Sequence, residues 1–332
     1  MGPVVERLEV PPAEVPPADA ESKGRVSGSW VFVALLCLLL LGQFFYAPYL
    51  TSPALQTWAT VFVAICVQAL PFLVFGVVLS AAITTFVPAS FWTRALPRRA
   101  ALAVPVAGAA GAVLPGCECA SVPVASGLIS RGVTPAAALA FLLSSPAINP
   151  VVVVATVVAF PGQPMMAVAR FTASLVVAVL VGWVWLRFGK GEWLRARRRH
   201  DHAGFAEAVR HDLLHAGGFL VVGGMAAATM NVVVPREWLN ALAGNFWLSV
   251  LALALLAVVL SICSEADAFV AASLTAFSPT ARLVFLVVGP MVDLKLIALQ
   301  TGTFGRRFAV RFVPLTFSLA VLVGVGAGTV LL

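Results

Sequence analysis

The stretch PGCECASVPVA, residues 115–125, places an acidic residue between two cysteines in a chain that is otherwise strongly apolar. Apolar residues make up 61% of the 332 residues and charged residues only 11%, against roughly 45–50% and about 25% in a soluble domain. A bilayer crossing needs about 20 predominantly apolar residues. Runs of that length include Trp30–Leu50, Trp58–Val87, Pro135–Phe160, Met165–Phe188 and Phe308–Leu332. The composition therefore predicts an all-α polytopic membrane protein.

A second stretch, ICSEADAFV at residues 262–270, matches the first when the chain is shifted by 144 residues. The shift aligns Cys119 with Cys263, Pro135 with Pro279 and Pro146 with Pro290, and it places Asn149 on Asp293. Cysteines and prolines are rare within spans, so their coincidence indicates a duplicated unit. The predicted organisation is a disordered tail (1–29), an extra transmembrane helix (30–50), one repeat (55–187), a basic and histidine-containing linker (188–212) and a second repeat (213–332).

The charges predict the topology. Lys and Arg residues cluster in short loops, which places those loops in the cytoplasm and explains the net charge of +7 without a nucleic-acid partner. With three net crossings per unit the second repeat is inverted, the N-terminus is cytoplasmic and the C-terminus external. Each repeat is expected to contain a broken or re-entrant helix hairpin, which makes seven crossings and two hairpins. If every hairpin arm spans the membrane, the count is eleven.

Four acidic residues do not fall in the tail, the linker or an outer loop: Glu118, Glu265, Asp267 and Asp293. An acid at bilayer depth costs about 2.5–3.5 kcal/mol or more, so such residues usually face a water-filled path. Helix breaks are expected beside them, because proline removes an amide donor and glycine favours turns. The expected breaks are at Pro115, Gly116, Pro146, Pro150 and Pro290.

Inverted repeats that meet at broken helices form a substrate site near the bilayer midplane. That site is expected to collect Cys117, Glu118, Cys119, Ser145, Asn149, Cys263, Glu265, Asp267 and Asp293. Thiolates favour soft metals or metalloids, and carboxylates compensate the charge of a cation. In an extended turn Cys117 and Cys119 point the same way and can bind one atom; in a helix they cannot.

Several alternatives stay open at this level. The two cysteines of the first motif could be buried packing residues, and Glu265 and Asp267 could lie at the outer surface. Asp293 and Lys295 are two residues apart, and residues at that spacing on a helix do not face each other. Lys295 is therefore interpreted as a residue that sets the local electric field or snorkels to the membrane interface. His211 and His215 have the i, i+4 spacing of a zinc-like site, although a solvated or membrane-surface segment is the preferred interpretation.

The sequence also resembles a known family. GCECASVPVASGLISRGVTPAAALAFLLSSPAINPVVV, residues 116–153, and SEADAFVAASLTAFSPTARLVFLVVGPMVDLK, residues 264–295, are similar to the predicted permeases that include the ArsP-type organoarsenical efflux permeases. The resemblance covers roughly residues 55–330 and is closest to a branch without an assigned substrate. It implies a transporter of the cytoplasmic membrane, with efflux of trivalent arsenicals in the ArsP branch. Cys117 and Cys119 match the cysteine motif of the family, whereas Ala120 replaces a usual glycine.

The sequence thus predicts a permease, not an enzyme, that moves a thiophilic metal ion or metalloid and needs no cofactor. Its partners are the lipid bilayer and a small inorganic or organometalloid solute. Proton coupling is expected because the chain contains no G-x-x-x-x-G-K-[ST] nucleotide motif. Two alternatives are a membrane thiol-disulfide redox protein using Cys117, Cys119 and Cys263, and a non-transporting subunit of a larger assembly.

Overall fold

The computed structural model describes residues 52–86, 91, 96–97, 99–113, 118–189, 191–194, 205–233 and 244–332. Within these ranges the regular structure is helical, with no strand, and this confirms the predicted all-α class. The expected tail, the span Trp30–Leu50 and the residues Pro115, Gly116 and Cys117 lie outside the described ranges.

The helices of the described ranges fall into two consecutive sets of six. The first set is α2 (Pro53–Phe86), α4 (Ala100–Ala110), α5 (Glu118–Ser130), α6 (Pro135–Ile148), α7 (Pro150–Ala159) and α8 (Pro164–Phe188). After a short 3₁₀ helix, η2 (Gly191–Trp193), the second set is α9 (Phe205–Val233), α11 (Phe246–Leu260), α12 (Ser264–Ser273), α13 (Pro279–Val288), α14 (Leu294–Phe304) and α15 (Arg306–Leu331).

Among the described residues, five helical stretches are long and apolar enough to cross a membrane: α2, the α6–α7 pair, α8, α9 and α15. The helices α4, α5, α11 and α12 are only 10 to 15 residues long. At about 1.5 Å per residue they extend about 15–23 Å, which is less than the ~30 Å of the hydrocarbon core. Their lengths favour two half-crossing hairpins over four additional spans.

The two sets correspond element by element. Proline begins both α6 and α13, since its fixed φ suits the first helical turn. Asn149 caps α7 by accepting a hydrogen bond from the Val152 amide, and Asp293 caps α14 in the same way. The helix-breaking positions therefore follow the 144-residue offset of the sequence, while the inverted orientation of the second set stays a prediction.

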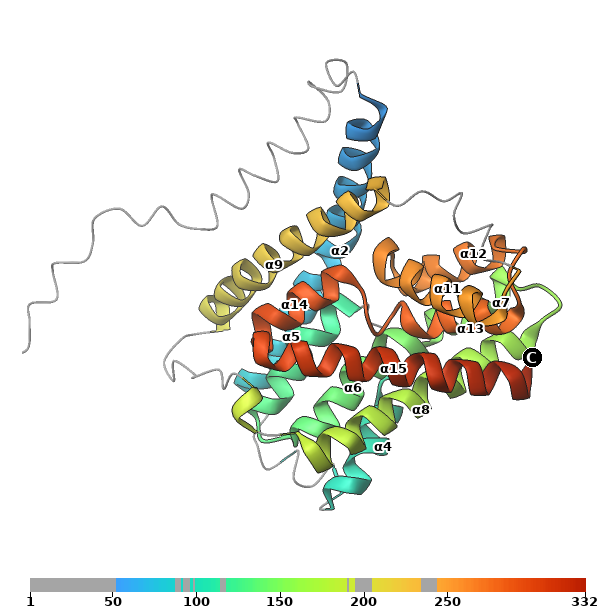
Figure 1. The fold of residues 1–332 in the computed structure, drawn as a ribbon. Helices are drawn as coiled ribbons and strands as arrows, with labels where there is room; N and C mark the ends of the chain where they lie inside the picture. The colour runs from blue at the N-terminus through green and yellow to red at the C-terminus, as the bar shows by residue number, and fades with distance from the viewer. Residues whose placement is uncertain are drawn as a thin grey trace, which may run out of the picture.

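The packing has the same correspondence. The helix α6 packs against α4 and α8, and α13 packs against α11 and α15. Between the sets, α5 contacts α14 and α7 contacts α12, so each hairpin helix reaches a broken helix of the other set. Figure 1 shows α8 and α15 side by side across the molecule, and α2 and α9 paired at its edge.

Candidate functional site

The site is built where helices begin inside the apolar body of the molecule. Glu118 is the first residue of α5, Ser264 is the first residue of α12, and Asp293 is the N-cap of α14. The amide groups of a helix N-terminus carry partial positive charge, so acidic side chains are stabilised there. Glu118 and Asp293 occupy such positions, which reduces the cost of placing carboxylates in an apolar interior.

A buried lysine joins these helix starts. The Lys295 ammonium lies 2.6 Å from Glu118 Oε1 and 3.7 Å from Asp293 Oδ2, and it donates a hydrogen bond of 2.8 Å to the Ser261 carbonyl. Glu118 Oε2 accepts a hydrogen bond of 3.3 Å from the Ser264 hydroxyl. Glu118, Asp293 and Lys295 are 0–2% exposed. We call Glu118, Ser261, Ser264, Asp293 and Lys295 the lysine cluster.

A second charged group lies beside the lysine cluster. Arg170, on α8, donates hydrogen bonds of 2.8 Å to Thr156 Oγ1 on α7 and 2.9 Å to the Ser264 carbonyl on α12. It also interacts electrostatically with Asp267 and Glu265. Arg170 and Asp267 are each 1% exposed. Because Arg170 connects α7 and α8 to α12, it ties the two helix sets together.

Asp267 is the least satisfied carboxylate of this region. Its Oδ2 has no hydrogen-bond partner among the described residues. The same oxygen fills the space where a side chain at Gly289 would begin, which explains the glycine at this position. An incompletely satisfied buried carboxylate is costly and is typical of functional sites.

Two thiols adjoin the lysine cluster. Cys119 lies in the first turn of α5, Cys263 is the N-cap of α12, and both thiols are buried. Both interact electrostatically with the Lys295 ammonium. In the described part of the chain no group of three or more His, Cys, Asp or Glu side chains could hold a metal ion. Lys295 supplies the positive charge that the carboxylates require.

Three expectations from the sequence need correction. From Glu118 onwards the first motif is helical, whereas an extended turn across Cys117 and Cys119 was expected. Lys295 does not snorkel, because its side chain is buried and ion-paired. The argument that Asp293 and Lys295 cannot approach each other assumed one continuous helix; α14 begins after Asp293, whose extended backbone brings the two side chains together.

The remaining predicted residues are placed as follows. Ser145 and Asn149 are buried at the junction of α6 and α7, where Asn149 Nδ2 donates to the Ser145 carbonyl at 3.1 Å. Pro146 lies inside α6, Pro150 begins α7 and Pro290 lies between α13 and α14. Glu265 is half-buried in the first turn of α12.

The two histidines lie elsewhere on α9. His211 is exposed and contacts Asp212 at 3.4 Å, whereas His215 Nε2 lies 3.0 Å from the Gly302 carbonyl. Gly302 is seven residues after Lys295 on α14, a rise of about 10 Å. The histidine pair is therefore separate from the lysine cluster.

Arg170, Ser261, Ser264 and Thr156 were missed as site residues. Arg170 is the one charged residue between Met165 and Leu186. A single arginine in a transmembrane run is a signal of a buried, functional charge. Ser261, Ser264 and Thr156 contribute through hydroxyl and carbonyl oxygens. Composition and spacing do not distinguish such serines and threonines from residues that only pack.

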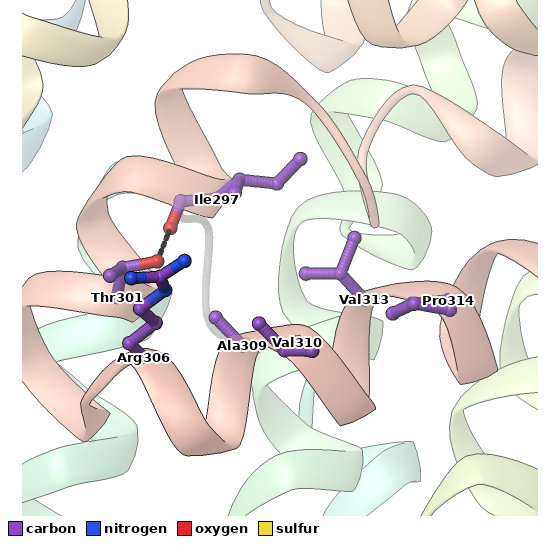
Figure 2. A pocket seen from close by; sticks show the side chains of 7 residues that line it. All are labelled: Ile297, Thr301, Arg306, Ala309, Val310, Val313 and Pro314. Atoms are coloured by element: carbon purple, nitrogen blue, oxygen red, sulfur yellow. Dashed lines mark hydrogen bonds between the residues drawn. The ribbon is translucent and has the colours of Figure 1, made fainter.

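A cavity of about 470 Å³ lies on a different side of α14, between α14 and α15 (Figure 2). Its lining is mostly apolar, with Arg306 at one end and Pro314 at the other. None of its lining residues belongs to the lysine cluster. The cavity therefore gives no entrance to the charged residues, which are enclosed in this conformation.

Comparison with known proteins identifies the family. Residues 54–328 match a family described as predicted permease, ArsP_1. The chain is 32% identical over 276 residues to the UPF0718 protein YcgR of Bacillus subtilis, covering 79% of this chain and 93% of that protein. It is also 32% identical over 290 residues to a putative two-component membrane permease complex subunit of Streptococcus mutans, covering 83% and 95%. No solved structure matches. The chain is thus a multi-pass membrane protein that belongs to the ArsP_1 family of predicted permeases.

Proposed function

We propose that this permease moves a thiophilic metal or metalloid past the lysine cluster and its two adjacent thiols. The observation that carries the proposal is the Glu118–Lys295 ion pair at 2.6 Å, buried where the N-termini of α5, α12 and α14 meet. Secondary transporters bind their substrates at such broken-helix junctions near the bilayer midplane. Ionisable residues there are costly and are kept for a path or a coupling step.

The thiols favour a soft solute. Cys119 and Cys263 come from corresponding hairpins of the two helix sets and both lie within electrostatic reach of the Lys295 ammonium. Thiol ligands select soft ions and metalloids over hard cations. Of the two expected solutes, a trivalent arsenical fits this arrangement better than a zinc-like cation, since a cationic side chain already lies between Glu118 and Asp293.

Proton movement is the proposed energy source. The buried carboxylates of Asp267 and Asp293 are groups that can exchange a proton when the site opens. Release of a proton from one of them as the solute binds would couple the two movements. Purified protein in liposomes with a trapped pH dye tests this: solute-dependent proton flux is expected, and solute transport that proceeds without any flux would exclude coupling.

The transport proposal is tested in everted membrane vesicles. Uptake of arsenite, methylarsenite, Zn²⁺ and Cd²⁺ is measured by elemental analysis for the wild type, Cys119→Ser and Cys263→Ser. We expect at least a tenfold loss of uptake in both variants, because each removes one of the two buried thiols at the cluster.

Cys66→Ser is the matched control. Cys66 is a third buried thiol, but it packs on α2 against Phe62 and Ala228, in a small cluster of its own. Its substitution should leave uptake within about twofold of the wild type. If none of the four solutes moves in the wild type, or if Cys66→Ser loses as much uptake as Cys119→Ser, the proposed thiol role is wrong.

A second proposal concerns a partner subunit. The Streptococcus mutans relative is named as a subunit of a two-component membrane permease complex, and it aligns with 83% of this chain. We therefore propose that this chain also works with a second membrane protein. Purification in mild detergent should give a stoichiometric partner; reconstituted transport by the chain alone at the rate seen in native vesicles would contradict this.

The redox alternative is less favoured. Thiol-disulfide exchange requires a thiolate that a partner can reach, whereas Cys119 and Cys263 are 1% and 3% exposed.

A further inference from the structure

The oxygen atoms around Lys295 have the composition of a cation site. Two carboxylate oxygens, Glu118 Oε1 and Asp293 Oδ2, and the Ser261 carbonyl surround the ammonium at 2.6, 3.7 and 2.8 Å. Carboxylates and backbone carbonyls are the ligands that hard divalent cations prefer. In this chain the position of the cation is filled by the nitrogen of a side chain.

We propose that Lys295 is a built-in cation that excludes divalent metal ions from the Glu118–Asp293 carboxylates, and that it restricts the solute to neutral or anionic species. The inference about the solute rests on the proposed transport function. The exclusion of divalent ions is a property of the folded protein and can be measured without transport.

The ammonium is held firmly in place. The ammonium donates a hydrogen bond of 2.8 Å to the Ser261 carbonyl and forms ion pairs with Glu118 at 2.6 Å and with Asp293 at 3.7 Å. The backbone is equally constrained, because Gly223 on α9 packs so closely on Lys295 that a side chain at that glycine would overlap the lysine Cα. The lysine therefore has no room to withdraw towards α9 while α14 keeps its present position.

Charge balance gives the exclusion its strength. Among the described residues, the fully buried cationic side chains are Lys295 and Arg170. The fully buried acidic side chains are Glu118, Asp267 and Asp293. A divalent ion added beside the ammonium would meet like charge at close range in a medium where such repulsion is strong. Removing the ammonium leaves the carboxylates with uncompensated negative charge, which a divalent ion can neutralise.

The experiment measures Mn²⁺ binding to the purified full chain. Mn²⁺ is a hard ion that prefers oxygen ligands, so the neighbouring thiols contribute little to its binding. Electron paramagnetic resonance of free Mn²⁺ is recorded for the wild type, Lys295→Met, Lys295→Gln and Lys295→Arg. We expect Lys295→Met and Lys295→Gln to bind Mn²⁺ at least tenfold more tightly than the wild type, and Lys295→Arg to bind as weakly as the wild type.

A double variant assigns the ligands. In Lys295→Met/Glu118→Gln both members of the 2.6 Å ion pair become neutral and Asp293 is the one carboxylate left in the lysine cluster. A single carboxylate is a weaker ligand than two for a divalent ion, so the tenfold gain should disappear. If the double variant keeps the full gain, the ion binds elsewhere and the proposal is overturned. It is also overturned if the wild type binds Mn²⁺ as tightly as Lys295→Met.

Folding is monitored by gel filtration and thermal unfolding in detergent. If Lys295→Met or Lys295→Gln folds only when it is purified with Mn²⁺, the result supports the proposal, because the ion then replaces the ammonium. If neither variant folds with or without Mn²⁺, the ion does not replace the ammonium and the proposal fails. If the Mn²⁺ binding results are as expected but no solute is taken up by the vesicles, the proposed transport function is wrong and the exclusion of divalent ions still stands.

Discussion

Replacing Arg170 by Met tests whether the two helix sets are held together by a buried arginine. The guanidinium donates hydrogen bonds of 2.8 Å to Thr156 Oγ1 and 2.9 Å to the Ser264 carbonyl, and it opposes the charge of Asp267. Methionine keeps much of the length of the side chain and removes both the charge and the donors. The variant therefore removes the polar connection between α7, α8 and α12 while leaving an apolar stem.

The expected loss follows from these contacts. A hydrogen bond from a charged group contributes about 1.5–3 kcal/mol, and breaking a buried ion pair by removing one partner costs about 3–5 kcal/mol. Polar contacts in membrane proteins have given smaller couplings, up to about 1.7 kcal/mol, because the unfolded chain in the membrane also finds partners. Arg170 makes two hydrogen bonds and compensates a charge, so we expect a loss of about 3 kcal/mol, more than a hundredfold in the unfolding equilibrium.

The assay is reversible unfolding of the purified protein in mixed micelles. Arg282→Met is the matched control, because Arg282 also lies in an apolar helix but is half-buried and is placed over the Phe160 ring at 5.5 Å. A cation–π contact of this kind contributes about 0.5–1 kcal/mol. Adding Asp267→Asn to Arg170→Met should recover part of the loss, since the fully buried carboxylate is then no longer left charged without its partner. Equal losses in Arg170→Met and Arg282→Met would refute the reasoning.

Two further predictions concern the backbone around the site. Gly289→Ala should lower the free energy of unfolding by about 1–3 kcal/mol, because the new methyl group overlaps the Asp267 carboxylate. Gly326→Ala is the control and should be neutral or slightly stabilising, because a Cβ at that position meets open space. Equal thermal stability of the two variants would contradict this prediction. Asn149→Ala should cost about 1 kcal/mol by removing the cap of α7. Asp293→Asn keeps a capping oxygen on α14, so its thermal stability should exceed that of Asp293→Ala, and the reverse order would exclude the capping role.

Much of the architecture follows from local sequence features. Apolar runs of sufficient length identify α2, α6–α7, α8 and α15 as spans, because the thickness of the bilayer fixes the number of residues needed to cross it. Prolines and capping side chains mark the breaks at Asn149 and Asp293, since both act on the backbone within a few residues. The cost of burying an acid singles out Glu118, Glu265, Asp267 and Asp293; Glu118, Asp267 and Asp293 are fully buried, whereas Glu265 is half-buried.

The hairpin geometry was less predictable. The stretch from Cys117 to Cys119 was expected to be an extended turn on account of Pro115 and Gly116, yet α5 begins at Glu118. Helix N-termini stabilise acidic residues, and this effect applies to Glu118 as soon as the helix starts there. Whether Cys117 and Cys119 can point the same way depends on whether the backbone is extended or helical there, and their spacing in the sequence does not decide between the two.

The sequence by itself determined the membrane class, the helix breaks at Asn149 and Asp293 and the buried acids, because each of these depends on composition or on neighbours along the chain. Only the tertiary structure decided which charge meets which: Lys295 with Glu118, Arg170 with the Ser264 carbonyl, and Asp267 against Gly289. A buried ion pair requires its partners within a few ångströms and in the right orientation. That condition is met by packing helices from opposite ends of the chain, and no local periodicity encodes it.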